Sequence, residues 1–258
     1  MGNEKLIQDE FRKQSKKFDL RLTAVSNPEY LSWTVDKLPL TPDMRVLDVA
    51  AGTGQLGRAI APHVRNVVAV DITEEMIEVG RRASHQLDLR NIEFLAASAY
   101  ELPFVERSFD LVVSRLSVHH FDRPEQAMAE MARVCRPSGP VAIIDMVAPA
   151  TAEQARSFNE MEKLRDPSHV QFYTLEGIQK LMNDAGVEPK SHFAKEIPIN
   201  VDNWLELSGA SEEMAHRIKL ALQNDLSGAS QTGMNPYWHE GALFYNQTWV
   251  TLLGTARA

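Results

Sequence analysis

The fold class of this chain is decided by one stretch, Val46-Leu47-Asp48-Val49-Ala50-Ala51-Gly52-Thr53-Gly54. A short apolar run ends in small residues, and the glycines that follow let the backbone turn sharply and approach a ligand closely. Residues 55–63 then have the pattern of a helix, whose first N–H groups would face the turn. A strand, a glycine turn and a helix in this order predict the first unit of a ligand-binding α/β sheet.

The rest of the chain continues the same alternation. From Met44 onward, short β-branched runs alternate with longer amphipathic stretches, which is the pattern of βαβ units and a parallel sheet. Strands are expected at residues 45–49, 66–71, 92–96, 109–114, 141–145, 191–199 and 242–254. We therefore predict an α/β fold.

We expect a single domain over residues 1–258, because proline and glycine are scattered and no linker-like segment interrupts the chain. Residues 1–42 would form an N-terminal helical cover. Residues 43–150 would form the cofactor-binding core, and 151–258 the C-terminal half with a helical insert at about 201–240.

Composition and charge narrow the class of partner. The 27 lysines and arginines against 35 acidic residues give a net charge of −8, and no basic stretch is present, so nucleic acid is not expected as a partner. No apolar run approaches the ~20 residues of a membrane span. The single cysteine, Cys135, excludes an internal disulfide and indicates no metal cluster, so we expect a cytoplasmic enzyme without a metal. The sequence carries no signal for the oligomeric state.

The turn by itself does not identify its ligand. Gly52, Gly54 and Gly57 match G-x-G-x-x-G, and Asp71 ends the next expected strand, a combination that suits NAD, FAD and S-adenosylmethionine alike. Asp48, four residues before Gly52, favours the last of these. Its carboxylate would repel a pyrophosphate but suits the zwitterionic methionine end of S-adenosylmethionine. A nicotinamide-dependent oxidoreductase is the alternative from the same fold.

The following segments carry a resemblance: 46–54, Val70-Asp71, Leu102-Pro103-Phe104, 108–112, His119-His120-Phe121 and 133–139. Together they resemble the class I, Rossmann-like S-adenosylmethionine-dependent methyltransferases related to the ubiquinone/menaquinone C-methyltransferases. Residues 164–170 resemble, more narrowly, a group of uncharacterised bacterial methyltransferases. The resemblance covers about residues 40–190, and its motifs are specific for the cofactor but not for the substrate.

The resemblance implies a seven-stranded, mostly parallel, doubly wound sheet with an antiparallel last strand and S-adenosyl-L-methionine as cofactor. Gly52 and Gly54 would bracket the methionine moiety, Asp71 would accept both ribose hydroxyls, and Ile72 would lie against adenine. Ser98 stands where the family usually has an aspartate for the adenine amino group. The full implied cofactor set is Asp48, Ala50, Gly52, Gly54, Asp71, Ile72, Ser98, Ala99 (through its backbone N–H) and Ser114.

Candidates for catalysis follow the fourth expected strand, where His119 and His120 would lie at the ligand-binding edge of the sheet. A base is needed only if the acceptor must lose a proton; otherwise both histidines would be structural. Tyr30, Trp33 and His169 are candidates for contact with the acceptor. Tyr30 and Trp33 could instead belong to the core, and His169 could instead end a helix with local hydrogen bonds. We expect a small organic acceptor, aromatic or quinone-like, methylated at carbon, oxygen or nitrogen. A non-catalytic S-adenosylmethionine-binding regulator is the alternative from another class.

Overall fold

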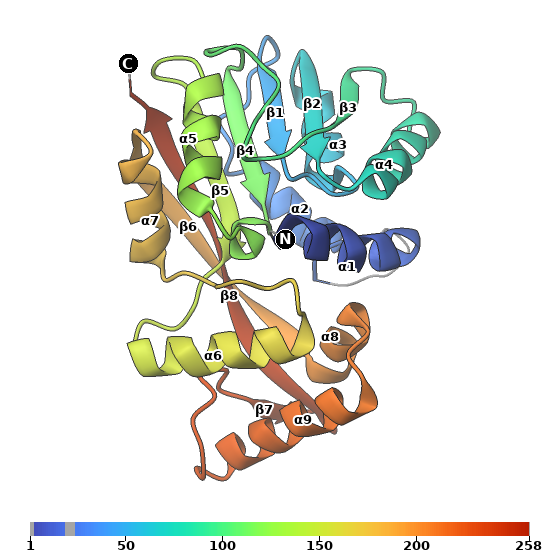
Figure 1. The fold of residues 1–258 in the computed structure, drawn as a ribbon, viewed down its shortest axis with the longest axis vertical. Helices are drawn as coiled ribbons and strands as arrows, with labels where there is room; N and C mark the ends of the chain where they lie inside the picture. The colour runs from blue at the N-terminus through green and yellow to red at the C-terminus, as the bar shows by residue number, and fades with distance from the viewer. Residues whose placement is uncertain (1–2, 19–23, 258) are drawn as a thin grey trace.

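The computed structural model describes residues 3–18 and 24–257 of the chain, and a single mixed sheet organises them (Figure 1). The sheet order is β3-β2-β1-β4-β5-β8-β6, with the short β7 paired to β8. The strands are β1 Arg45–Val49, β2 Asn66–Asp71, β3 Ile92–Ala96, β4 Leu111–Arg115, β5 Pro140–Met146, β6 Val187–Asn200, β7 Tyr237–His239 and β8 Ala242–Ala256. Strands β1 to β5 pair in parallel and β8 runs antiparallel to both neighbours, which confirms the predicted fold class.

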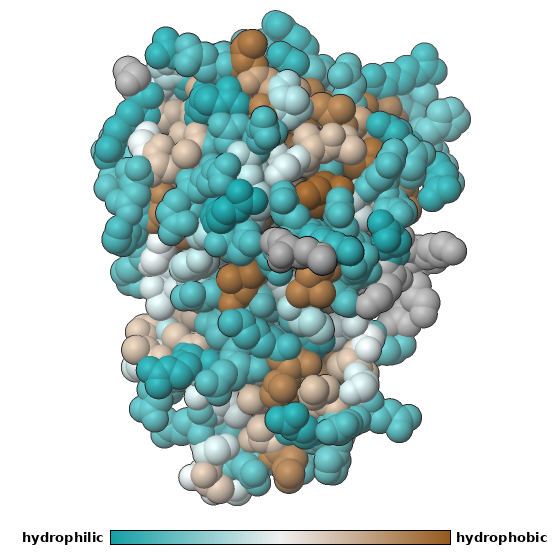
Figure 2. Space-filling model, in the orientation of Figure 1, coloured by the Kyte–Doolittle hydropathy of each residue, from teal (hydrophilic) through white to brown (hydrophobic). Residues whose placement is uncertain are grey.

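Helices cover both faces of this sheet. They are α1 Asn3–Phe18, α2 Pro28–Val35, α3 Gln55–Ile60, α4 Glu74–Gln86, α5 Pro124–Val134, α6 Ala152–Arg165, α7 Leu175–Asp184, α8 Val201–Ser208 and α9 Glu212–Leu226, with 3₁₀ turns at Ala61–His63 and Val118–His120. Among the described residues, no helix combines the length and the apolar character that crossing a bilayer requires. Polar side chains cover most of the face seen in Figure 2, with apolar ones scattered near its middle.

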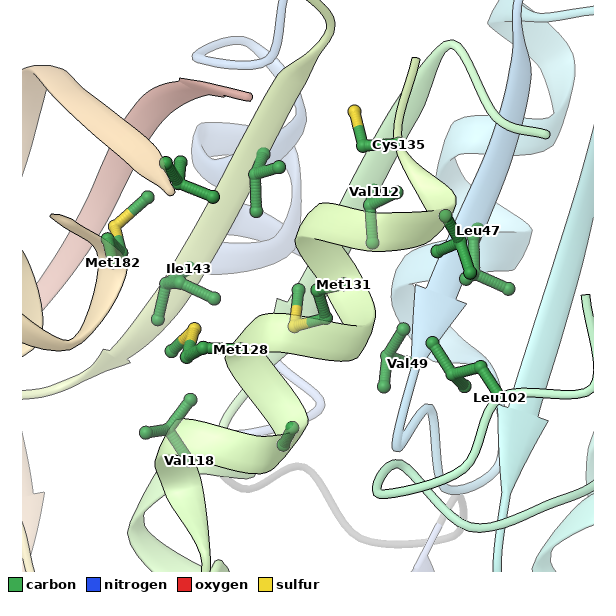
Figure 3. Packing of buried hydrophobic residues seen from close by; sticks show 14 of the residues in the cluster. Leu47, Val49, Leu102, Val112, Val118, Met128, Met131, Cys135, Ile143 and Met182 are labelled. Carbon is green, nitrogen blue, oxygen red and sulfur yellow. The ribbon is translucent and has the colours of Figure 1, made fainter. Parts of the chain in front are cut away.

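Alternation along the strands divides the core into two layers, because successive side chains point to opposite faces. On β1, Leu47 and Val49 pack on the side of α5 and α7, whereas Val46 packs on the side of α2 and α3. Figure 3 shows the first layer, in which Met128 and Met131 of α5 lie against the sheet. The two layers hold β1 and β4 rigidly, so the loops at their carboxyl ends start from fixed positions.

The last two long strands build a second region of the molecule. Met146 at the end of β5 pairs with Trp249. Strands β6 and β8 continue beyond this point as an extension, and the short β7 pairs with the start of β8 on its other side. Helices α6, α8 and α9 pack on the extension around their own buried cluster, which includes Trp204, Tyr245 and Trp249. Figure 1 shows this region below the arrowheads of the parallel strands. The carboxyl edge of the sheet therefore faces the C-terminal region.

The element boundaries differ most from the sequence-based expectations at three places. The expected strand at 109–114 begins at Leu111, because Phe109 forms only an isolated bridge with Cys135. The expected strand at 191–199 extends over Val187–Asn200. The helical insert expected at about 201–240 is two helices, because Gly209 ends α8 in the left-handed conformation with φ 67°. The insert is helical only to Leu226, and the strand β7 lies in its last part.

Candidate active site

The turn after β1 has the backbone conformation that its glycines suggested. Ala50, Gly52 and Gly54 have φ values of 53°, 57° and 71°, in the left-handed region that glycine adopts without strain. The turn closes through a hydrogen bond from Gly54 N to Ala51 O at 2.8 Å. A Cβ atom placed on Gly52 would meet no protein atom within 4 Å. The space beside Gly52 is therefore available to a ligand.

Asp71 ends β2 directly beside this turn. Its Oδ2 accepts a hydrogen bond from Gly52 N at 2.7 Å, and its Oδ1 accepts one from Thr73 N at 2.8 Å. Burial raises the pKa of Asp71, and these backbone hydrogen bonds oppose that shift. The carboxylate thus holds both the glycine turn and Thr73, the residue before α4, and its remaining lone pairs can receive hydroxyl donors.

Asp48 and Arg115 extend from β1 and β4 on the same face of the sheet and carry opposite charges. Asp48 Oδ2 accepts a hydrogen bond from Gly57 N at 2.9 Å, while Oδ1 is buried without a partner among the described residues. Arg115 donates from Nη2 to Val25 O at 2.7 Å, and its Nε is likewise buried without an acceptor. Burial raises the pKa of Asp48 to about 7 and lowers that of Arg115 to about 10. Each charge opposes the pKa shift that burial causes in the other, and both residues line the cavity described next.

These groups line one cavity at the carboxyl edge of the sheet, here called the glycine-turn pocket. It encloses about 900 Å³ between protein atoms, part of it open to solvent. Seven of the expected site residues line it: Asp48, Ala50, Gly52, Asp71, Ile72, Ala99 and His120. The wall is completed by α1 and by apolar side chains such as Phe11, Leu116 and Phe121.

Three expected cofactor residues lie at the margin of this pocket and outside its lining. Gly54 packs against Phe94, whose ring atoms would lie 2.5 Å from an added Cβ. Ser114 is fully buried and donates from Oγ to Val49 O at 2.9 Å. Ser98 donates from Oγ to Glu4 Oε1 of α1 at 2.6 Å. Helix α1 also reaches the pocket through Gln8, whose Nε2 donates to Ile72 O at 2.9 Å.

The two candidate catalytic histidines occupy different positions. His120 lines the glycine-turn pocket, with Phe11 edge-on at 5.2 Å between ring centroids. Burial, and then the neighbouring His119, lower the pKa of His120 to about 4. His119 lies outside the pocket lining, and its Nδ1 is 2.7 Å from Asp145 Oδ1 at the end of β5. Its ring centroid is 4.2 Å from that of His120.

The three candidates for acceptor contact are not brought together. His169 is buried behind His119, with Nε2 at 2.7 Å from Asn159 Oδ1, and lines neither pocket described here. Tyr30 lines a second cavity, here called the aromatic pocket. Trp33 is half-buried on α2 and lines neither pocket. The aromatic pocket is lined by Ala24, Val25, Asn27, Tyr30, Met146, Arg165, Pro198, Ile199, Asn200, Asn203, Trp204, Leu207, Phe244, Gln247 and Trp249.

Sequence reasoning missed Arg115, Asp145 and the pocket residues of α1. The signal for the first two was a charged residue near the end of an apolar strand, since β4 ends Ser114-Arg115 and β5 ends Asp145-Met146. Glu4 gave no such signal, because its contact with Ser98 joins residues 94 positions apart. In the part of the chain that the structure describes, no three histidine, cysteine or acidic side chains are placed to hold a metal ion.

Comparison with known proteins agrees with this geometry. A family model described as a methyltransferase domain matches residues 47–143. The uncharacterized methyltransferase YcgJ of Bacillus subtilis is 31% identical over 188 residues, which cover 73% of this chain and 74% of that protein. The crystal structure of YcgJ superposes with a TM-score of 0.81 at 26% identity, covering 88% of this chain and 98% of that one.

One further relative and one further solved structure show what the likeness does and does not carry. A demethylmenaquinone methyltransferase of Renibacterium salmoninarum is 35% identical over 136 residues, and the match spans 52% of this chain and 55% of that protein. The cyclase SpnF shares the fold with a TM-score of 0.62 at 14% identity, covering 89% of this chain and 80% of that one. The fold alone therefore does not determine the reaction.

Proposed function

The chain belongs to the class I S-adenosylmethionine-dependent methyltransferases, and from this we propose that it methylates a small organic acceptor, aromatic or quinone-like, at carbon, oxygen or nitrogen. The cofactor is S-adenosyl-L-methionine, which supplies an activated methyl group on a sulfonium. The proposal concerns the acceptor and the residues that hold both molecules. A relative named as a demethylmenaquinone methyltransferase supports the quinone-like class.

In this proposal, the glycine-turn pocket holds the cofactor. Asp71 accepts hydrogen bonds from the ribose hydroxyls, and Ile72 lies against the adenine. The Ala99 N–H and the Ser98 hydroxyl serve the adenine edge, which requires Ser98 to exchange its bond with Glu4 or to share it. Ala50, Gly54 and Ser114 keep the turn and the strand ends in place beneath the cofactor, and the open space at Gly52 supports close backbone contact.

The unpartnered atoms of Asp48 and Arg115 fit the zwitterionic methionine end. The Asp48 Oδ1 would receive the ammonium group, directly or through water, and the Arg115 guanidinium would receive the carboxylate. Binding would supply each buried charge with its missing partner, and charge-assisted hydrogen bonds of this kind are among the stronger ones in proteins. This complementarity is the observation that carries the cofactor assignment.

The apolar wall of the same pocket supports a small organic acceptor. Phe11, Leu116 and Phe121 line it beside His120, and its concave shape would exclude a folded macromolecule. Methyl transfer is an in-line displacement, so positioning supplies much of the rate enhancement. The chain's task is then to orient the acceptor atom and to exclude water.

His120 is the better placed of the two histidines to receive a proton, because it lines the pocket and is neutral at pH 7. His119 acts on it as a positioning residue, since Asp145 fixes its ring against that of His120. An acceptor that arrives already ionised would need neither histidine as a base.

Two measurements test the proposed function. Calorimetric titration of the purified protein with S-adenosylmethionine should show binding, whereas NAD should show none. Incubation with methyl-labelled S-adenosylmethionine and a metabolite extract should then give a labelled product of low molecular mass, identified by mass spectrometry. Label only in protein or nucleic acid would contradict a small-molecule acceptor.

A further inference from the structure

Three carboxylates line the glycine-turn pocket among the described residues, those of Glu4, Asp48 and Asp71. The proposed function gives Asp48 and Asp71 a partner on the cofactor but gives none to Glu4. We propose that Glu4 of α1 accepts a hydrogen bond from the exocyclic amino group of the adenine, and that this contact makes the site select a 6-amino over a 6-oxo purine. The inference rests on the proposed function and adds a specificity-determining residue to the cofactor site.

One face of α1 forms part of the pocket wall. Glu4, Ile7 and Phe11 all line the pocket, and their spacing of three and four residues places them on the same side of a helix. Ile7 and Phe11 are apolar, so Glu4 is the charged group that this face presents to the pocket. An acidic side chain in the first turn also suits the helix dipole, but that effect does not require it to face a cavity.

Hydrogen bonds hold this face of α1 against the loops that carry the cofactor residues. Asn3 Nδ2 donates to His120 O, after β4, at 2.7 Å. One turn further along the helix, Gln8 Nε2 donates to Ile72 O, after β2, at 2.9 Å. Glu4 lies between these two anchors, so the structure fixes the position of its carboxylate relative to Ile72, which the proposed function places against the adenine.

The Glu4 carboxylate keeps acceptor capacity after its contacts within the protein. Its Oε1 accepts the hydrogen bond from Ser98 Oγ at 2.6 Å, and its Oε2 lies 3.7 Å from Arg123 Nη2. The second distance exceeds that of a hydrogen bond, and the side chains of Arg123 and Glu4 are 49% and 33% exposed, so Arg123 stabilises the carboxylate only weakly. An ionised carboxylate has about four lone-pair sites, so this one can receive a donor from the pocket.

Ser98 places the Glu4 carboxylate at the end of β3. The Ser98 hydroxyl donates its one proton to Glu4 and accepts a hydrogen bond from Tyr100 N at 3.1 Å. It therefore keeps its bond to Glu4 and can share the amino group through its remaining lone pair. Ala97 and Ala99, on either side of Ser98 in the chain, line the pocket. The Glu4 carboxylate thus lies beside the backbone that would meet the adenine edge.

The hydrogen-bonding pattern of this edge matches adenine. Adenine presents an amino donor at position 6 beside a ring nitrogen that accepts, whereas a 6-oxo purine presents an acceptor at position 6 and an N1–H beside it. A carboxylate from Glu4 next to the Ala99 N–H is the complement of the first pattern. Against the second pattern it places acceptor against acceptor and donor against donor, which leaves polar groups of the site without partners. Sites that lose their hydrogen bonds in this way reject the analogue strongly.

Two ligands that differ only on this edge of the purine test the inference. S-Inosylhomocysteine has a 6-oxygen and an N1–H where S-adenosylhomocysteine has a 6-amino group and a bare N1, and calorimetry gives the dissociation constant of each. The wild type should bind S-adenosylhomocysteine about 100-fold more tightly. In Glu4→Gln this ratio should fall to about tenfold or less, because the amide of glutamine can turn either its oxygen to an amino group or its NH₂ to a 6-oxygen.

The ratio of affinities separates direct contact from support of the helix. If Glu4 only held α1 in place, Glu4→Gln and Glu4→Ala would weaken both ligands by the same factor. Contact with the amino group instead predicts that both variants weaken S-adenosylhomocysteine and leave S-inosylhomocysteine bound at least as tightly as in the wild type. Asp9→Asn is the matched control, because it makes the same change of charge on α1 at a 46% exposed side chain outside the pocket lining. It should keep the wild-type ratio.

Two results would overturn the inference. One is a wild-type protein that binds the two ligands with affinities within about threefold of each other. The other is a Glu4→Gln protein that is folded by circular dichroism and keeps the wild-type ratio. If the wild type binds S-adenosylhomocysteine, either result rejects the role of Glu4 and leaves the proposed function standing. A wild-type protein that binds neither ligand contradicts the proposed function as well.

Discussion

The parallel half of the sheet and the C-terminal region differ in how they present a ligand site. The parallel half uses backbone, with a left-handed turn at Gly52 and N–H groups that Asp71 orders. The C-terminal region uses side chains, with Tyr30 from α2 completing the rings of α8 and β8. A backbone site suits one invariant cofactor, whereas a wall of side chains can be altered residue by residue. Substitutions in the wall of side chains can therefore change the aromatic pocket without changing the backbone of the glycine turn.

Gly52→Val should have the largest effect of the variants proposed here, because it should abolish S-adenosylmethionine binding in the parallel half of the sheet. A β-branched residue resists φ 57°, and its side chain would fill the space beside the turn. Calorimetry should detect no binding, while circular dichroism should show that the variant is folded. Gly228→Val is the matched control, since Gly228 also has a positive φ and open space but lies after α9. Cofactor binding by a folded Gly52→Val protein would remove the turn from the site.

Asp71→Ala should weaken cofactor binding by about 2–5 kcal/mol, because two charge-assisted hydrogen bonds to the ligand are lost. The same change also frees Gly52 N and Thr73 N, so the melting temperature is measured alongside. Asp43→Ala, at an exposed position away from the pocket, is the control. Unchanged affinity in a folded Asp71→Ala protein would reject the ribose assignment.

His120 should make stability depend on pH. Its pKa is about 4 in the folded protein and about 6.5 in the unfolded chain, so the unfolded chain binds more protons between these values. The stability that depends on neutral His120 is complete above pH 6.5 and is lost as the pH falls to 4, by about 3 kcal/mol. Urea unfolding should show this loss in the wild type relative to His120→Phe. If the free energy of unfolding changes with pH in the same way in both proteins, His120 lies in a solvated environment.

The same position distinguishes a base from a packing residue. If His120 receives the proton, His120→Ala should lower the rate per folded molecule by roughly 10²–10⁴-fold at unchanged cofactor affinity. His169→Ala, a buried histidine outside both pockets, should lower stability and leave that rate nearly unchanged. Near-wild-type rates in His120→Ala would mean that the acceptor binds already ionised.

Arg115→Met should have the smallest effect on cofactor affinity. It tests the residue that lies between the glycine-turn pocket and the aromatic pocket. It keeps an unbranched side chain and removes the guanidinium, whose carbon lies over Trp249. We expect about 10- to 100-fold weaker binding of S-adenosylhomocysteine, because one charge-assisted hydrogen bond contributes about 1.5–3 kcal/mol. Methylthioadenosine, which lacks the amino-acid end, should bind as it does to the wild type. An equal loss for both ligands would show that Arg115 supports the fold and does not contact the carboxylate.

The sequence was most informative where the candidate site residues lie close together along the chain. Gly52, Asp48 and Asp71 could be found because the turn and the two strand ends have a fixed spacing set by β-strand geometry. The sheet could be found because β-branched runs alternate with amphipathic segments. The antiparallel last strand could be predicted only from the family resemblance, because hydrophobic periodicity does not determine the order or direction of strands.

The rest depended on contacts between distant residues. Glu4 meets Ser98, and Arg115 meets Val25 and Trp249, through pairings that no local pattern records. His169 was a candidate for acceptor contact because of its neighbours in sequence, yet its ring packs among His119 and Phe172. Trp204 lies in an expected cover, but only packing reveals that its indole nitrogen has no partner.

Hydrogen–deuterium exchange on the wild type tests most directly which of the two regions holds the cofactor. With saturating S-adenosylhomocysteine, exchange should slow in residues 50–54, 71–73 and 97–100, while residues 200–207 and 242–249 exchange as in the free protein. Protection of 200–207 by the cofactor product, with none at 50–54, would contradict the placement of the cofactor at the glycine turn.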